Sequence, residues 1–174
     1  MLKQLTSALA AFAAWVGHSP LNAAVVDTPW IIPTVQVIHI MAVAFTLAAV
    51  VIINLRVLGL IEVSEPLNAV ADRFLPTLPV TLSILAVTGF LLIAGEPTRA
   101  IFRYVFWLKM SLIVVAAGMA WGLGQLVRSG RVPTSGKGLL AFRGAAIISL
   151  SLWLAIIVAG RWIGYAGGWP GSPQ

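Results

Sequence analysis

Long stretches without charged residues constrain this chain more than any other feature. The 28 residues between Asp27 and Arg56 contain no Asp, Glu, Lys or Arg. Four mostly apolar stretches follow one another, at about 31–55, 75–95, 101–127 and 139–165, and the first two contain no charged residue. Each approaches or exceeds the roughly 20 residues that an α-helix needs to cross a bilayer. Because lipid cannot satisfy the open backbone groups of a strand, we expect all four stretches to be helices.

The composition also indicates a membrane protein. The chain is 60% hydrophobic and 9% charged, whereas soluble domains carry about 25% charged residues. The net charge of +6 does not indicate nucleic-acid binding, because the 11 basic residues are scattered between apolar runs. The lack of cysteine excludes disulfides, thiolate metal sites and covalently attached haem. We therefore predict an all-α integral membrane bundle of four spans.

The N-terminal part, residues 1–30, differs from the transmembrane domain at 31–174. Four apolar residues recur on one helical face, and they are Leu5, Leu9, Phe12 and Val16. The run stops at Gly17-His18-Ser19-Pro20. This pattern predicts an amphipathic helix that lies in the membrane interface. A signal peptide is the alternative, because Lys3 precedes a short apolar core.

The basic residues predict the orientation. With four spans, both termini lie on one side of the membrane, and the cations on that side are Lys3, Arg99, Arg103 and Arg161. The cations on the other side are Arg56, Arg73, Arg128, Arg131, Lys137 and Arg143. Since cytoplasmic loops are enriched in Lys and Arg, we expect the termini to be periplasmic and the membrane to be a bacterial inner membrane.

Two ionisable residues, His39 and Lys109, lie well inside the predicted spans. His39 is about nine residues from the start of the first span, and Lys109 is about nine residues from Ile101. At 1.5 Å per residue, both would lie roughly 12–14 Å below the same face. Three threonines share a face of the second span: Thr77, Thr81 and Thr88. Because a polar group in a span is costly, we expect His39 and Lys109 to form one functional site.

One interpretation of His39 is an axial ligand of a b-type haem. Arg103, Arg161 or Lys109 would then pair with the haem propionates. The second ligand would be His18, Met110 or Met41, or that position would stay open. The other interpretations stay open: a copper or proton-relay role, or a structural histidine bonded to Gln36, a backbone carbonyl or a threonine. Lys109 could equally extend to the interface, and Arg161 could anchor its helix there. Asn54 and Arg56 are expected at a solvated helix end.

Three motifs resemble an uncharacterised family of small bacterial four-helix membrane proteins. They are His39 with Asn54-Leu-Arg-Val-Leu-Gly59, Phe106-Trp-Leu-Lys109, and Ala159-Gly-Arg-Trp-Ile-Gly-Tyr165. The histidine in the first span and the lysine in the third are also similar to the copper-resistance D membrane proteins. Both resemblances imply that His39, Lys109, Arg161 and Trp162 form one group.

These observations lead to one functional hypothesis and two alternatives. We expect an inner-membrane redox or anchoring subunit that binds a single haem b near the periplasmic face and partners a larger membrane or periplasmic protein. The alternatives are a transporter or copper-handling protein with the same pocket, and a purely structural accessory subunit. The sequence has no Walker loop, G-x-S-x-G or H-E-x-x-H motif, so a self-contained hydrolase is not expected.

Overall fold

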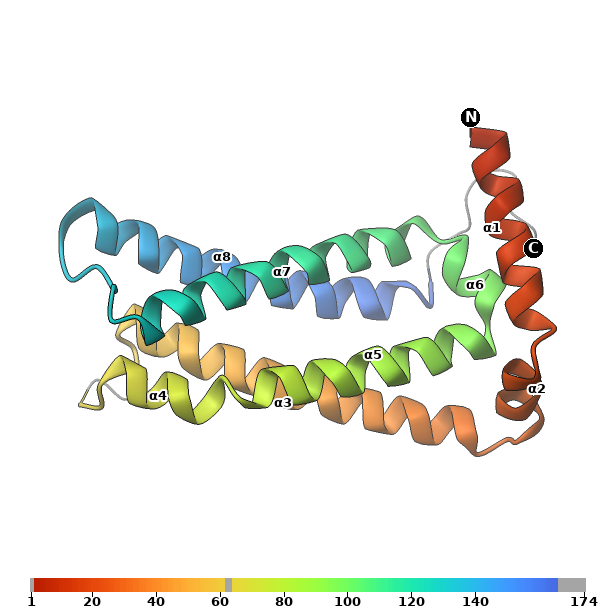
Figure 1. Ribbon diagram of the computed structural model, residues 1–174, viewed down its shortest axis with the longest axis horizontal. Helices are drawn as coiled ribbons and strands as arrows, with labels where there is room; N and C mark the ends of the chain where they lie inside the picture. Colours follow the sequence, from red (N-terminus) through yellow and green to blue (C-terminus); the bar gives the residue numbers. More distant parts are fainter. Residues whose placement is uncertain (1, 62–63, 166–174) are drawn as a thin grey trace. The chain divides into compact units, whose positions relative to one another are not determined.

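The structure, a computed structural model, describes residues 2–61 and 64–165. Within these described residues, eight helices follow one another (Figure 1). Their bounds are α1 Leu2–Gly17, α2 Pro20–Asp27, α3 Ile31–Leu58, α4 Leu67–Phe74, α5 Thr77–Gly95, α6 Pro97–Ile101, α7 Tyr104–Arg128 and α8 Gly136–Trp162. No strand occurs in the described residues. The all-α prediction is therefore confirmed.

Four helical stretches are long and apolar enough to cross a membrane. They are Ile31–Leu58, Leu67–Gly95, Tyr104–Arg128 and Gly136–Trp162. The helices expose large apolar side chains, and Val114, Trp121 and Leu140 are each more than 70% exposed. Lipid is the solvent that such surfaces match. The four-span prediction is confirmed.

The observed helix limits differ from the predicted ones at several ends. The first span continues to Leu58, beyond the predicted residue 55. The third begins at Tyr104, because Pro97–Ile101 forms the separate short helix α6. Pro97 stands at the start of α6, where its missing N–H costs no hydrogen bond. Residues 163–165 follow the end of α8 instead of extending it.

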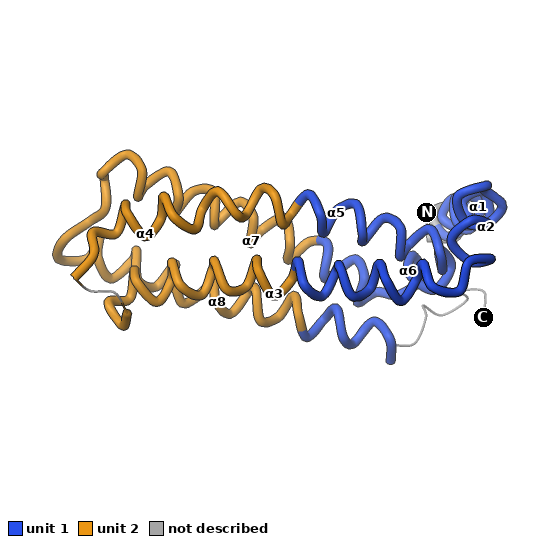
Figure 2. Tube along the Cα trace, turned by 90° about the horizontal axis from the view of Figure 1, so that it is seen from below, with its two compact units in different colours: residues 1–42, 83–110, 158–174 blue, residues 43–82, 111–157 orange. Residues whose placement is uncertain are grey.

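The chain folds as two compact units, which Figure 2 distinguishes by colour. Unit 1 comprises residues 1–42, 83–110 and 158–174, and unit 2 comprises residues 43–82 and 111–157. Each unit contains residues of α3, α5, α7 and α8. The main buried cluster of unit 2 consists of Ala49, Val50, Leu78, Ala116, Trp153 and Ile156.

The N-terminal helices pack within unit 1. The turn at Gly17–Ser19 separates α1 from α2, and Ser19 caps α2 by accepting a hydrogen bond from the Asn22 backbone N–H at 3.1 Å. The two helices are bent by 62° and would form a fifth, broken span if they crossed the membrane together. Ala13 of α1 is buried against Ile101 and Phe102, while Phe12 and Trp15 are exposed.

Asn22 connects α2 to the end of α5. Its Nδ2 donates to the carbonyl oxygens of Ala94, at 2.6 Å, and Gly95, at 3.3 Å. The last carbonyls of a helix have no partner within that helix, so the amide satisfies groups that would otherwise need water. This contact therefore fixes α2 beside the end of the second span.

We expect Asn22→Ala to loosen α2. Loss of these hydrogen bonds should cost about 1 kcal/mol, which corresponds to about fivefold faster local opening. Hydrogen exchange of the α2 amides, followed by mass spectrometry, measures the change. Asn68→Ala is the matched control, because Asn68 is exposed on α4. Equal exchange of α2 in wild type and Asn22→Ala would contradict the assignment.

Candidate functional site

The candidate site lies in unit 1, where His39 of α3 meets Thr88 of α5. His39 Nδ1 is 2.7 Å from Thr88 Oγ1. Thr88 is buried, with 5% of its surface exposed, and His39 is half-buried. The imidazole is thus held by a specific hydrogen bond between two membrane-spanning helices. Of the partners considered for His39, the structure selects a threonine.

The hydrogen bonds of Thr88 determine which ring nitrogen of His39 carries the proton. Thr88 Oγ1 is 2.6 Å from the carbonyl oxygen of Ile84, which can only accept. The single hydroxyl proton therefore goes to Ile84, and Thr88 accepts from His39 Nδ1–H. In a neutral imidazole the other nitrogen, Nε2, then keeps its lone pair. This is the tautomer of a histidine that ligates a metal through Nε2, with Nδ1 fixed by a protein partner.

A glycine allows the ring to lie close to α5. A Cβ built on Gly89 would be 3.6 Å from His39 Cε1, which is van der Waals contact. The ring edge therefore packs against the α5 backbone one residue after Thr88. A large side chain at position 89 would compete with the imidazole for this space.

Lys109 of α7 lies near His39 within unit 1. Its charge is close enough to interact electrostatically with the imidazole. Its side chain packs over Gly160 of α8, where a Cβ built on the glycine would be 3.5 Å from Lys109 Nζ. Within residues 2–61 and 64–165, Nζ has no hydrogen-bond acceptor. Since α7 begins at Tyr104, Lys109 is five residues into its helix, about 7–8 Å along it. The predicted nine-residue depth was wrong, because it placed the helix start at Ile101.

All predicted site residues belong to unit 1, but their side chains do not all converge. Arg103 donates to the carbonyl oxygen of Ile163. Arg161 donates to Tyr165 Oη at 3.0 Å and lies over its ring. Both contacts are exposed and lie at the end of α8. Three more are exposed: His18, Met110 and Trp162. The structure therefore brings His39, Thr88 and Lys109 together, and leaves Arg161 and Trp162 outside this group.

The described residues contain no group of three or more His, Asp or Glu side chains that could hold a metal ion. A bare copper or zinc ion normally takes several protein ligands. A porphyrin instead supplies four nitrogens of its own, so one imidazole is enough to hold its iron. The single imidazole of His39 is therefore compatible with a haem as ligand.

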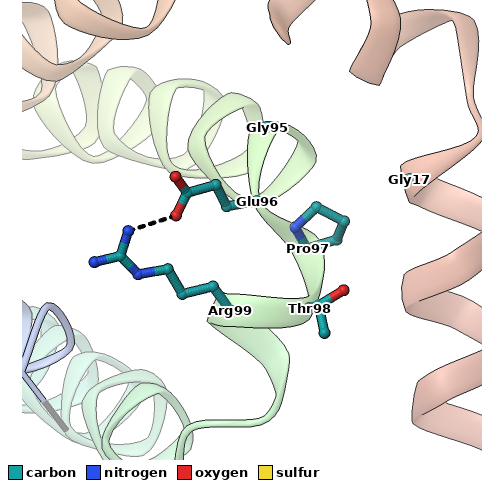
Figure 3. A pocket seen from close by; sticks show the side chains of 6 residues that line it. All are labelled: Gly17, Gly95, Glu96, Pro97, Thr98 and Arg99. Atoms are coloured by element: carbon teal, nitrogen blue, oxygen red, sulfur yellow. Dashed lines mark hydrogen bonds and ion pairs between the residues drawn. The ribbon is translucent and has the colours of Figure 1, made fainter. Parts of the chain in front are cut away.

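A separate cleft of about 430 Å³ lies between the end of α1 and the start of α6 (Figure 3). The residues that line it are Gly17, Gly95, Glu96, Pro97, Thr98 and Arg99. Glu96 and Arg99 form an ion pair at 2.8 Å, and both side chains are at least half exposed. Such exposed pairs contribute little to stability. None of the predicted site residues lines this cleft.

Sequence reasoning placed Asn54 at a solvated helix end, and this was wrong. α3 continues to Leu58, and Asn54 is only 4% exposed. Its Nδ2 donates to the Val50 carbonyl oxygen at 2.8 Å and to Ser149 Oγ of α8 at 3.3 Å. The sequence signal that could have found it is a polar side chain about one turn before Leu58, in a helix without charges until Arg56.

The tautomer of His39 is a direct test of this geometry. At a pH where the ring is neutral, ¹⁵N NMR of the imidazole should show Nδ1 protonated and Nε2 unprotonated in the wild type. Thr88→Val should shift the population toward the Nε2–H form, because Nδ1–H loses its acceptor, whereas Thr88→Ser should not. His18, which is exposed, is the internal reference. A wild-type His39 protonated at Nε2 would contradict the assignment.

Comparison with known proteins gives one match. The model of a family of unknown function, DUF6644, matches residues 23–166, which include His39, Thr88 and Lys109. No curated protein and no solved structure matches the chain. Because the matched region covers most of the sequence, the chain belongs to this family of unknown function.

Proposed function

We propose that this protein is an inner-membrane redox or anchoring subunit that binds a single b-type haem through His39. The observation behind this proposal is the pair of hydrogen bonds at Thr88. They hold the His39 ring through Nδ1 and leave the Nε2 lone pair available. A haem bound there would supply one-electron transfer, which no side chain near His39 can perform.

Each residue near His39 has a distinct part in this proposal. His39 Nε2 would hold the haem iron, and Thr88 orients the ring and fixes its tautomer. The unpaired Lys109 ammonium complements a propionate. Arg103 is already bonded to Ile163, and exposed Arg161 to Tyr165, so neither is assigned to a propionate. A second ligand would have to come from His18 or Met110, which are both exposed in the structure, or that position would stay open to a small molecule.

Apart from one bound haem, this chain would offer few groups that can do chemistry. Four spans and short connections leave no large extramembrane domain in the described residues. We therefore infer a larger membrane or periplasmic partner that delivers or accepts the electron. A copper-handling role for His39 and Lys109 is the second candidate, with transport or a structural role as further alternatives.

Protein purified in mild detergent should show a Soret band. His39→Ala should abolish the band, because the iron loses its axial ligand, and Lys109→Gln should weaken haem binding roughly tenfold, or about 1.4 kcal/mol. Absorption spectra and haem titration measure both effects. His18→Ala should shift the spectrum if His18 is the second ligand and leave it unchanged if Met110 or an open position is opposite His39.

Size-exclusion chromatography and helical circular dichroism establish that each variant is folded. Wild-type protein that stays colourless even when haem is supplied during expression would end the haem proposal. Specific copper binding that His39→Ala abolishes would then support the second candidate.

We further infer that both termini are periplasmic. The six cations predicted on the side opposite the termini all belong to unit 2: Arg56, Arg73, Arg128, Arg131, Lys137 and Arg143. Cytoplasmic loops are enriched in Lys and Arg in this way. An alkaline phosphatase fusion at the C-terminus should be active, and a green fluorescent fusion there should be dark. The same fusions after Arg131 should give the opposite result. A fluorescent C-terminal fusion would reverse the orientation and place the His39 site in the cytoplasmic half.

A further inference from the structure

A small cavity in unit 2 borders two buried polar side chains. Its volume is about 20 Å³, and it is lined by Asn54, Ser149 and otherwise apolar residues, among them Val50 and Leu78. Asn54 is 4% exposed and Ser149 is 1% exposed. Neither side chain has direct access to bulk water, so the protein interior must satisfy their polar atoms.

The Asn54 amide has one unsatisfied group. Both of its N–H groups are used, one by the Val50 carbonyl oxygen at 2.8 Å and one by Ser149 Oγ at 3.3 Å. Its oxygen, Oδ1, is buried and has no donor among the described residues. If the amide oxygen and nitrogen were exchanged, Asn54 Oδ1 would face the Val50 carbonyl oxygen, and two acceptors would repel each other. The assigned orientation is therefore the favourable one.

Ser149 has the complementary deficiency. Its oxygen accepts from Asn54, while within residues 2–61 and 64–165 its own hydroxyl proton has no acceptor. One unsatisfied acceptor and one unsatisfied donor therefore border the same cavity. A buried polar group left without a partner is energetically expensive, and a low-dielectric membrane interior increases that cost.

We propose that this cavity is a hydration site for one ordered water molecule. The water accepts from the Ser149 hydroxyl and donates to Asn54 Oδ1, which satisfies both groups. The cavity exceeds the roughly 10–15 Å³ that one water requires. A hard metal cation is not the occupant, because such ions take about six or more oxygen ligands and the cavity offers two side-chain oxygens.

Radiolytic hydroxyl-radical labelling tests the site, because a trapped water generates radicals next to side chains that bulk water does not reach. In wild-type protein in lipid nanodiscs, mass spectrometry should detect oxidation of Val50 and Leu78, which are only 2% and 7% exposed. Asn54→Leu has a similar shape and no polar atoms, so labelling at Val50 and Leu78 should be lost. Ser149→Ala should reduce it several-fold.

Ser151→Ala is the matched control on the same helix, because Ser151 is exposed and bonds only the Ile147 carbonyl oxygen in the described structure. It should label as the wild type does. Unlabelled Val50 and Leu78 in the wild type, or equal labelling in Asn54→Leu, would overturn the proposal. If Asn54→Leu does not fold, Ser149→Ala decides: unchanged labelling there overturns it. A wild-type structure that resolves ordered water must also show density between Asn54 Oδ1 and Ser149 Oγ.

Discussion

The hydrogen bond between His39 and Thr88 is the interaction on which the functional account depends. A polar side chain on a membrane-spanning helix has no water to bind, so it must find a partner on another helix. α3 meets this requirement three times. In unit 1, His39 bonds Thr88, and in unit 2, Thr46 bonds Thr81 at 2.8 Å and Asn54 bonds Ser149. These contacts specify helix pairing in a bundle whose other contacts are mostly apolar.

The same bond determines what His39 can do. Thr88 donates its hydroxyl hydrogen bond to the Ile84 carbonyl oxygen. The histidine therefore donates to Thr88 from Nδ1 and keeps a free lone pair on Nε2. The arrangement gives a fixed ring, an open lone pair on Nε2 and a nearby cation, and the proposed haem site rests on these three features. The hydrogen bond to Thr88 thus links α3 to α5 and also sets the ring orientation that the proposed haem site uses.

Much of the fold follows from the sequence, and less of the site does. Long apolar stretches predicted the four spans. Of the three threonines predicted to share a face of the second span, Thr81 and Thr88 are buried. Thr77, on the same predicted face, is exposed at the start of α5. The neighbours of α3 and α5 could not be predicted, because most of the surface of each helix is apolar and polar residues are few. Asn54 was therefore misjudged: its partner depends on which helices are neighbours, which periodicity does not encode.

Ligand rescue tests the central claim most directly. His39→Gly removes the imidazole and leaves space where it stood. If His39 is the axial ligand, this variant should lose the haem spectrum of the wild type, and free imidazole in the buffer should restore it. A haem spectrum that persists in His39→Gly without imidazole would contradict the account, because the iron would then be held elsewhere.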